Sequence, residues 1–197
     1  MKLKTILLNF FIVTSSFSQI PENAEDISPL LIGETVPNSV LFNADGKETE
    51  LNTIIKNKPT VLIFYRGGWC PYCNRHLAAL GESEKEIIDM GYQIVAISPD
   101  HFEMLKPTIE NEKLSYQVYS DKDASLIKML GIAFKTPERA KGYIFKKTKK
   151  EASDVLPVPT VMILDTKGKI HFEYINPDYS TRLSSDLLLA NLKALNI

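Results

Sequence analysis

The chain has 197 residues, of which 44% are hydrophobic and 24% are charged, and its net charge is −1. This length and composition predict one compact domain with an ample core. The near-neutral charge argues against broad nucleic-acid binding, and only a local basic cluster between Ala133 and Leu156 could attract an acidic partner.

The first 18 residues have the pattern of a secretory signal peptide. Lys2 and Lys4 precede an apolar run from Ile6 to Val13, and Ser16-Phe17-Ser18 supplies small residues at the positions that a signal peptidase recognises. A retained membrane anchor is the alternative, but the run is shorter than the ~20 residues that span a bilayer. We therefore expect cleavage after Ser18, export to the periplasm or the extracellular space, and no membrane contact afterwards.

The mature chain is predicted to begin with a loose polar linker, residues 19–27, followed by the folded domain, residues 28–197. The first expected element is a hairpin with strands at 40–42 and 49–51, because the turn between them contains Asp-Gly. Asn52 is expected to cap the short helix that follows.

The next expected element is a buried strand from Thr60 to Tyr65, whose residues are β-branched, aliphatic or aromatic and carry no charge. Gly67-Gly68 ends this strand, and Pro71 suits the first turn of a helix, where an amide hydrogen would have no intrahelical partner. We expect this helix to run to about Met90, with Gly91 as its stop. The residues on its inner face should be Leu77, Leu80, Ile87 and Ile88.

The protein's two cysteines, Cys70 and Cys73, are therefore predicted at a helix N-terminus, where free N–H groups and the helix dipole stabilise a thiolate. A structural disulfide in so short a ring would restrict the unfolded chain by only ~2 kcal/mol. A tetrahedral zinc site needs four ligands, and only three histidines are available to join the two sulfurs. Covalent haem attachment requires a histidine where Asn74 stands. Redox chemistry is the use that remains for the pair.

Downstream, expected strands alternate with expected helices, which indicates an α/β sheet with parallel members. The strands are predicted at 93–97 and 116–119, and the helices at 98–111 and 121–131, the first of them kinked or divided by Pro107. The chain is then expected to form an antiparallel hairpin and a last helix. The hairpin strands are placed at 161–164 and 169–174, and the helix from Ser184 to Leu195, with Leu187, Leu188 and Leu195 packed inward.

The segment between Ala133 and Leu156 is the most basic part of the chain. Its basic residues are Lys135, Arg139, Lys141, Lys146, Lys147, Lys149 and Lys150. One interpretation is a solvated insertion, since charge runs usually lie on solvated faces. The other is a docking surface for an electron-donating protein.

The run Phe64-Tyr65-Arg66-Gly67-Gly68-Trp69-Cys70-Pro71-Tyr72-Cys73 resembles the active-site segment of the peroxiredoxin-like branch of the alkyl hydroperoxide reductase/thiol-specific antioxidant family, in the thioredoxin superfamily. Further matches follow in order over roughly Ile27 to Leu195. They are Ile97-Ser98-Pro99-Asp100, Tyr119-Ser120-Asp121, Leu130-Gly131-Ile132, Val158-Pro159-Thr160 and Asp165-Thr166-Lys167-Gly168. The resemblance implies a thioredoxin-like α/β fold, a central mixed sheet flanked by helices, with an N-terminal β-hairpin extension.

The resemblance also implies roles for residues around the cysteines. Thioredoxin-like proteins place a cis proline opposite the dithiol, and Pro159 has that position here, so a cis bend would expose the Val158 backbone to a bound polypeptide. Trp69 is expected to shield the pair from water, and Tyr72 to contact substrate with it. Arg66 is the candidate cation for lowering a thiol pKa, whereas Arg75 and His76 are expected on the exposed helix face.

Two chemistries assign different jobs to the cysteines. In thioredoxin-type exchange, Cys70 attacks a disulfide and Cys73 resolves the mixed disulfide. In peroxiredoxin chemistry, a thiolate becomes a sulfenic acid and condenses with a second thiol. The peroxiredoxin pattern P-x-x-x-T-x-x-C places its peroxidatic cysteine at Cys73, so that Cys73→Ser should abolish peroxide consumption. The arginine that peroxiredoxins carry on a later strand has no match at Pro159-Thr160.

The sequence thus predicts a thiol-dependent antioxidant enzyme that reduces hydroperoxides through the Cys70/Cys73 couple, with electrons from an external thiol donor such as thioredoxin. No organic cofactor or metal is implied. The alternative is an extracytoplasmic disulfide reductase of the thioredoxin-like group; Cys-Pro-Tyr-Cys is also the glutaredoxin tetrapeptide. A redox-inert binding module is the hypothesis from a different class.

Overall fold

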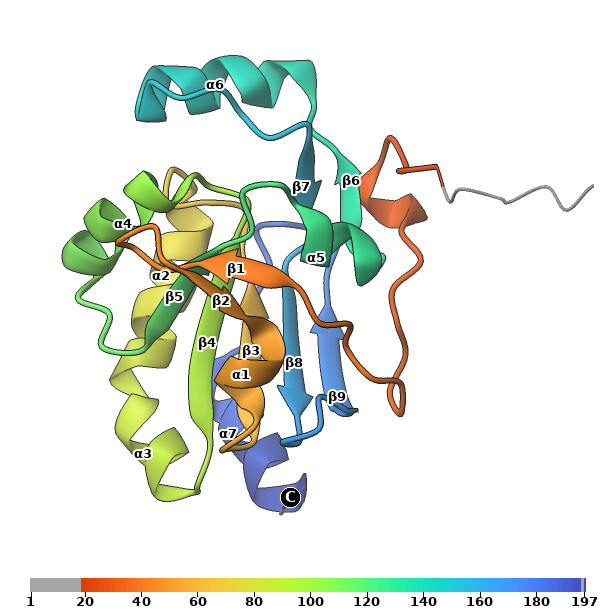
Figure 1. Ribbon diagram of the computed structural model, residues 1–197, viewed down its shortest axis with the longest axis vertical. Helices are drawn as coiled ribbons and strands as arrows, with labels where there is room; N and C mark the ends of the chain where they lie inside the picture. The colour runs from red at the N-terminus through yellow and green to blue at the C-terminus, as the bar shows by residue number, and fades with distance from the viewer. Residues whose placement is uncertain (1–18, 196) are drawn as a thin grey trace, which may run out of the picture.

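The computed structural model describes residues 19–195 and 197, which adopt an α/β fold (Figure 1). In this part of the chain seven strands form one mixed sheet in the order β2-β1-β5-β4-β3-β8-β9, and β6 and β7 form a separate two-stranded ribbon. The strands are β1 Val40–Phe42, β2 Glu48–Glu50, β3 Thr60–Phe64, β4 Gln93–Ser98, β5 Gln117–Ser120, β6 Ala133–Lys135, β7 Val155–Pro157, β8 Thr160–Leu164 and β9 Ile170–Ile175. The predicted signal peptide, 1–18, lies outside the described residues.

Strand β3 lies in the interior of the sheet, as its uncharged sequence predicts. It pairs in parallel with β4 and antiparallel with β8, and all of its residues are buried. Val61 and Ile63 point into one hydrophobic core, and Leu62 and Phe64 point into the other. Because successive side chains of a strand alternate between faces, an apolar run of this kind requires cover on both sides.

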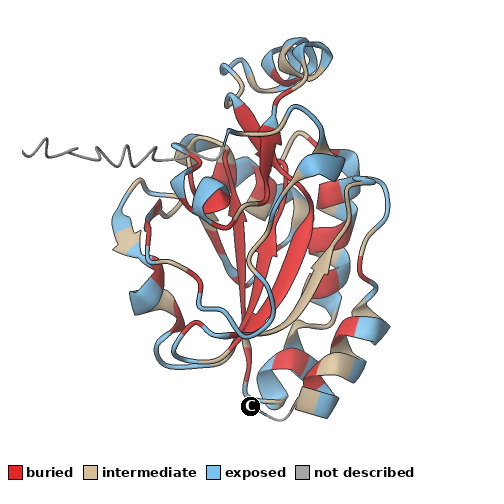
Figure 2. Ribbon diagram, turned by 90° about the vertical axis from the view of Figure 1, so that its right-hand side faces the viewer, coloured by how far each residue is buried: buried red, intermediate tan, exposed pale blue. Residues whose placement is uncertain are grey.

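Helices supply that cover. The face that receives Val61 carries α2 Pro71–Glu82, α3 Glu84–Asp89, α4 Leu105–Glu112 and α7 Ser185–Leu195, and the opposite face carries α1 Leu51–Ile55 and α5 Ser125–Met129. Short 3₁₀ turns lie at Ala24–Asp26 and Phe102–Met104, and α6 Glu138–Thr148 lies outside both layers. Figure 2 shows the buried sheet between these partly exposed layers. The predicted thioredoxin-like architecture is confirmed, and among residues 19–195 no helix has the length and hydrophobicity needed to cross a bilayer.

The N-terminal hairpin is confirmed, since β1 and β2 pair antiparallel from Val40 opposite Glu50. Asn52, however, lies inside α1 and does not cap it, because the helix already begins at Leu51. The Oδ1 atom of Asn38 accepts the Asn52 N–H at 3.0 Å and so satisfies one of the free donors of the first turn.

The helix predicted after the cysteines is two helices, because α2 ends at Glu82 and α3 begins at Glu84. Ile88 is 47% exposed and does not face the core as expected. In α7 the inward residues are Leu188 and Leu192, one helical turn apart, with Leu195 packed partly against the same core, whereas Leu187 is half exposed.

Pro107 neither kinks nor interrupts a helix. The chain divides just ahead of it, and Pro107 is the third residue of α4, where an N–H would have no intrahelical partner. The proline therefore belongs to the start of a helix, and the helical segment predicted over 98–111 consists of a 3₁₀ turn at Phe102–Met104 followed by α4 from Leu105.

The basic segment between Ala133 and Leu156 is a folded β6–α6–β7 unit (Figure 1), and only Ile144 of α6 is buried, which agrees with a solvated insertion. Phe134, Leu156 and Val158 form a small core of their own, against which Trp69 packs. Residues 19–27 depart from the expected loose linker: the Lys135 N–H donates to the Pro21 carbonyl at 2.8 Å, and Ile20, Ala24 and Ile27 pack against the cores.

Candidate active site

The two cysteines lie at the start of α2, after the turn that follows β3, as predicted. Cys70 is the N-cap of α2, Pro71 is its first residue, and the Cys70 carbonyl accepts the Asn74 N–H at 3.0 Å. The turn before them requires glycine: Gly67 has φ +145°, and a Cβ there would lie 2.2 Å from the Trp69 Nε1 atom. A local pattern of strand, glycine turn and proline-led helix therefore determines the position of the dithiol.

Both cysteines are buried, but only Cys70 lines a groove. Cys70 is 2% exposed and lies in a groove of about 900 Å³, whereas Cys73 is fully buried behind it. Four residues predicted for the site, Arg66, Trp69, Tyr72 and Pro159, line the same groove. A substrate that enters this groove meets the Cys70 sulfur.

The structure separates the pKa values of the two thiols. A hydrogen bond from the Cys73 side chain to the Cys70 sulfur, helped by the Cys73 N–H and by Arg66 and Arg182, lowers the pKa of Cys70 to about 6 against the opposing effect of burial. Burial and the same shared hydrogen bond raise the pKa of Cys73 well above its ordinary value. At neutral pH the pair therefore holds a thiolate at Cys70 and a proton at Cys73.

The Arg66 side chain lies beside Cys70 in an aromatic cage. Its guanidinium carbon is 4.3 Å from the Tyr179 ring centroid and 5.1 Å from that of Trp69, so both rings contribute cation–π attraction. Arg66 is only 8% exposed, and its Nε has no hydrogen-bond partner among residues 19–195. A buried cation in this position stabilises a thiolate on Cys70.

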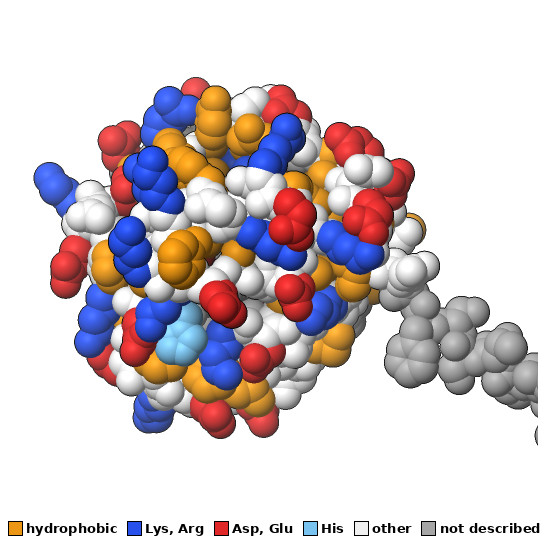
Figure 3. Space-filling model, turned by 90° about the horizontal axis from the view of Figure 1, so that it is seen from above, with side chains coloured by type: hydrophobic (Ala, Val, Ile, Leu, Met, Phe, Trp, Pro, Cys, Tyr) orange, Lys and Arg blue, Asp and Glu red, His pale blue; other side chains and the backbone are white. Residues whose placement is uncertain are grey.

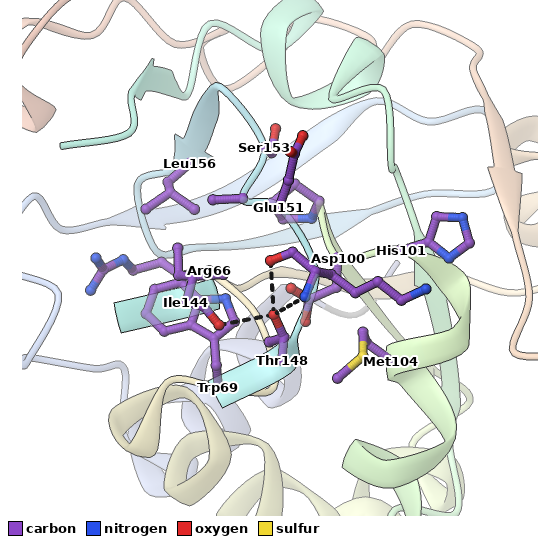
Figure 4. A pocket seen from close by; sticks show the side chains of 13 residues that line it. Arg66, Trp69, Asp100, His101, Met104, Ile144, Thr148, Glu151, Ser153 and Leu156 are labelled. Atoms are coloured by element: carbon purple, nitrogen blue, oxygen red, sulfur yellow. Dashed lines mark hydrogen bonds between the residues drawn. The ribbon is translucent and has the colours of Figure 1, made fainter. Parts of the chain in front are cut away.

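Asp100 lies under the cysteine loop. Its Oδ2 atom accepts the Gly68 N–H at 2.7 Å, and burial raises its pKa to about 7, although the hydrogen bonds from Gly68 and the Trp69 indole act in the opposite direction. Figure 4 shows Asp100, Arg66 and Trp69 around a small cavity of about 20 Å³, which has room for roughly one water molecule. The Thr148 hydroxyl donates to the Ile144 carbonyl at 2.9 Å at the other side of this cavity.

The expected role of Val158 and Pro159 requires correction. The Val158–Pro159 peptide bond is trans. Val158 is buried, its N–H donates to the Ile132 carbonyl at 2.9 Å, and its own carbonyl accepts the Thr160 hydroxyl at 2.9 Å. Because its N–H and its carbonyl are both already hydrogen-bonded, the Val158 backbone has no unpaired group with which a substrate strand could pair. Pro159 lines the groove, and its carbonyl accepts the Asn176 N–H at 3.2 Å.

Trp69 and Tyr72 form the walls of the groove, as their predicted contact with substrate requires. Trp69 packs partly buried against the core and meets Tyr143 edge-on, with ring centroids 6.2 Å apart. Tyr72 is 37% exposed and meets Tyr179 edge-on at 5.7 Å. The groove is therefore aromatic on both sides of Cys70.

Comparison with known proteins identifies the family. The model of the AhpC/TSA family matches residues 32–173, which is more than half of the chain. The chain belongs to the AhpC/TSA family. The family resemblance inferred from the segment around Cys70 is thereby confirmed.

Similar proteins include both peroxidases and disulfide oxidoreductases. The 1-Cys peroxiredoxin PER1 of Triticum aestivum is 26% identical over 168 residues, covering 82% of this chain and 71% of that protein. The thiol-disulfide oxidoreductase ResA of Bacillus anthracis is 24% identical over 163 residues, covering 82% and 80%. Among solved structures, reduced Prx3 from Vibrio vulnificus superposes with a TM-score of 0.71 at 20% identity, covering 83% of this chain and 99% of Prx3. Peroxidoxin BcpB from Mycobacterium tuberculosis superposes with a TM-score of 0.66 at 21% identity, covering 83% and 96%.

In this AhpC/TSA protein the buried cysteine also contacts an arginine, Arg182, that the sequence analysis did not identify. The Arg182 Nη2 donates to the Cys73 Sγ at 3.5 Å from a segment 109 residues further along the chain. Arg182 precedes α7 without any surrounding motif, so only its place in the fold connects it with the dithiol. His76 was expected to be exposed, but it is buried, and burial together with Arg182 lowers its pKa to about 4.

Proposed function

We propose that this AhpC/TSA protein reduces hydroperoxides with Cys70 as the attacking thiolate and Cys73 as the resolving thiol. Thiol-dependent oxidoreductase activity accords with its family. The observation that carries the finer assignment is the asymmetry of the pair: Cys70 has the lowered pKa and lines the groove, whereas Cys73 is buried and donates its hydrogen bond to Cys70. This asymmetry favours Cys70 over the assignment of Cys73 from the peroxiredoxin pattern.

The reaction follows from this arrangement. The Cys70 thiolate attacks the terminal oxygen of the hydroperoxide and the O–O bond breaks, so that Cys70 becomes a sulfenic acid. The alkoxide or hydroxide that leaves takes a proton from solvent and departs as alcohol or water. The Cys73 sulfur then attacks the Cys70 sulfur, the S–O bond breaks, and water carries away the hydroxyl group and the Cys73 proton. An external dithiol returns two electrons to the resulting disulfide.

Three side chains are assigned supporting roles in this proposal. Arg66 lines the groove that the peroxide would enter and stabilises the thiolate, since its charge already lowers the Cys70 pKa. Arg182 stabilises the developing thiolate on Cys73, 3.5 Å away. Trp69 and the other aromatic walls exclude water from the groove and so strengthen both electrostatic interactions.

Export and the electron donor are further parts of the proposal. The pattern of residues 1–18 supports secretion to the periplasm or the extracellular space. There a thioredoxin-like dithiol protein would be needed to keep the Cys70/Cys73 couple reduced, because such compartments are oxidising.

Disulfide reduction is the second candidate function, and the groove favours it specifically. Its volume of about 900 Å³ far exceeds that of hydrogen peroxide, and an N-capping Cys70 with a buried partner is also the arrangement that thiol–disulfide exchange requires. In that reaction the Cys70 thiolate would break a substrate disulfide, and Cys73 would then release the mixed disulfide.

Stopped-flow oxidation of the reduced protein by hydrogen peroxide tests the proposal. We expect Cys70→Ser to abolish peroxide consumption, and Cys73→Ser to consume one equivalent and accumulate a sulfenic acid that a dimedone probe captures. The opposite pattern would make Cys73 the attacking residue. Peroxide reactivity no faster than that of a free thiol, alongside rapid reduction of insulin disulfides, would replace the peroxidase proposal with the disulfide reductase.

A further inference from the structure

Helix α6 and the three residues after it carry positive charge that the ion pairs among the described residues only partly neutralise. Between residues 138 and 151 six basic side chains face two acidic ones, a net charge of +4 in a protein whose total is −1. Lys141 pairs with Glu138, and Lys150 pairs with Glu103. The remaining basic residues of the helix make no ion pair within residues 19–195, and they are Arg139, Lys146 and Lys147.

The same helix exposes aromatic side chains next to these cations. Tyr143 is 42% exposed and Phe145 is 54% exposed, so neither aromatic ring is buried in a core. Figure 3, which looks onto this end of the molecule, shows Lys and Arg side chains lying among hydrophobic ones over its left half. Exposed aromatic residues beside unpaired cations are typical of a surface that binds a protein.

This surface is continuous with the groove over Cys70. Arg139, Tyr143 and Lys147 follow one another at four-residue spacing, so they lie along one side of α6. Arg139 and Tyr143 line the groove that contains Cys70, and Tyr143 and Lys147 line a second hollow on the other side of Trp69. A molecule bound along this side of the helix would therefore lie over the groove that Cys70 lines.

We propose that this side of α6, which we call the α6 face (Arg139, Tyr143, Lys146 and Lys147), is the docking surface for the protein that reduces the Cys70–Cys73 disulfide, and that this partner carries Asp and Glu side chains around its own dithiol. The inference rests on the proposed function, because it concerns the second half of that redox cycle. Charge complementarity selects an acidic partner, and the exposed ring of Tyr143 supplies apolar contact area on this side of the helix.

The electron transfer is ordinary thiol–disulfide exchange. A partner thiolate attacks the Cys70 sulfur, because this is the sulfur that lines the groove, and the Cys70–Cys73 bond breaks as Cys73 leaves as a thiolate that then takes up a proton. The partner's second thiol loses its proton and attacks the partner sulfur of the mixed disulfide, which releases the Cys70 thiolate. The partner becomes a disulfide, and the pair in this protein is reduced by two electrons.

Three synthetic dithiol peptides test the inference. They share one Cys-x-x-Cys core and differ only in four flanking residues, which are all Glu, all Ser or all Lys. The rate at which each peptide reduces the oxidised protein can be followed through the fluorescence of Trp69, the chain's only tryptophan. At low salt we expect the Glu peptide to react about tenfold faster than the Lys peptide, with the Ser peptide between them. At about 1 M salt the ratio should approach one, because the Debye length falls to about 3 Å.

A charge-reversed variant and a matched control complete the test. In the Lys146→Glu/Lys147→Glu variant, the rate with the Glu peptide divided by the rate with the Lys peptide should fall to one or below. Lys56→Glu/Lys58→Glu makes the same change in charge on exposed residues at the far end of β3, and there the wild-type ratio should persist. Because the readout is a ratio measured on one protein, a general loss of reactivity does not alter it.

Two results would overturn the docking surface. The first is equal rates for the three peptides with the wild-type protein, and the second is the same fall of the ratio in the control variant. Failure of the proposed function would look different: neither the peptides nor dithiothreitol would restore peroxide-reactive thiols to the oxidised protein.

Discussion

The hydrogen bond between the two cysteines can be tested by changing its donor alone. It is the largest cause of the lowered pKa of Cys70, which is about 6. Cys73→Ala removes the donor, whereas Cys73→Ser replaces the thiol with a hydroxyl that can still donate. The two variants therefore differ in the one interaction at issue.

The expected size of the effect follows from the strength of such bonds. A hydrogen bond to a charged group contributes about 1.5–3 kcal/mol, and one pKa unit corresponds to about 1.4 kcal/mol, so Cys73→Ala should raise the Cys70 pKa by about 1–2 units. At pH 7 the thiolate fraction of Cys70 would fall from about nine tenths to between about one half and one tenth. Cys73→Ser should keep the pKa near its wild-type value.

Ultraviolet thiolate absorbance against pH measures the Cys70 pKa directly, and the pH dependence of alkylation by iodoacetamide gives an independent value. Thermal unfolding of both variants serves as the control for folding. If the alanine and serine variants have the same Cys70 pKa, the Cys73 hydrogen bond is not what lowers it. The helix N-terminus and the two arginines would then have to account for the whole shift.

Three more predictions concern the residues around the dithiol. Burial raises the pKa of Asp100 from 3.8 to about 7, so between these pH values the folded protein holds a proton that the unfolded chain has lost. The free energy of unfolding should therefore fall by at most about 4 kcal/mol as the pH rises from about 4 to about 7. Asp100→Asn should remove this decline, as measured by urea unfolding at about pH 5 and about pH 8; an unchanged slope would contradict it. Arg182→Met should raise the Cys73 pKa, and a rise of one unit would slow disulfide formation about tenfold. The initial reaction with peroxide should slow less. If both stopped-flow phases slow equally, the role assigned to Arg182 is wrong. Gly68→Ala places a Cβ 1.9 Å from the Thr108 Oγ1 and should cost about 1–3 kcal/mol of stability, part of which Gly68→Ala/Thr108→Ala should restore in thermal denaturation.

The local features of the active site could be predicted from the sequence because each depends on neighbours in the chain. The uncharged run of β3 requires cover on both faces, the glycine at position 67 adopts a backbone conformation that other residues rarely reach, and Pro71 suits the first turn of α2. These requirements place Cys70 and Cys73 at a helix N-terminus wherever the rest of the chain lies. The α/β alternation and the family resemblance follow from patterns of the same short range.

Only the tertiary structure decided which groups surround the sulfurs and which sulfur is accessible. Arg182 reaches the Cys73 sulfur and Asp100 reaches the Gly68 N–H from distant parts of the chain, and α6 forms one wall of the groove because β6 and β7 hold it there. The backbone pairing of Val158 and the burial of His76 likewise depend on neighbours that no local pattern specifies. The order of residues determines strands, helices and turns through short-range sterics and periodicity, whereas the pKa of a thiol depends on charges and hydrogen bonds that exist only once remote segments have packed together.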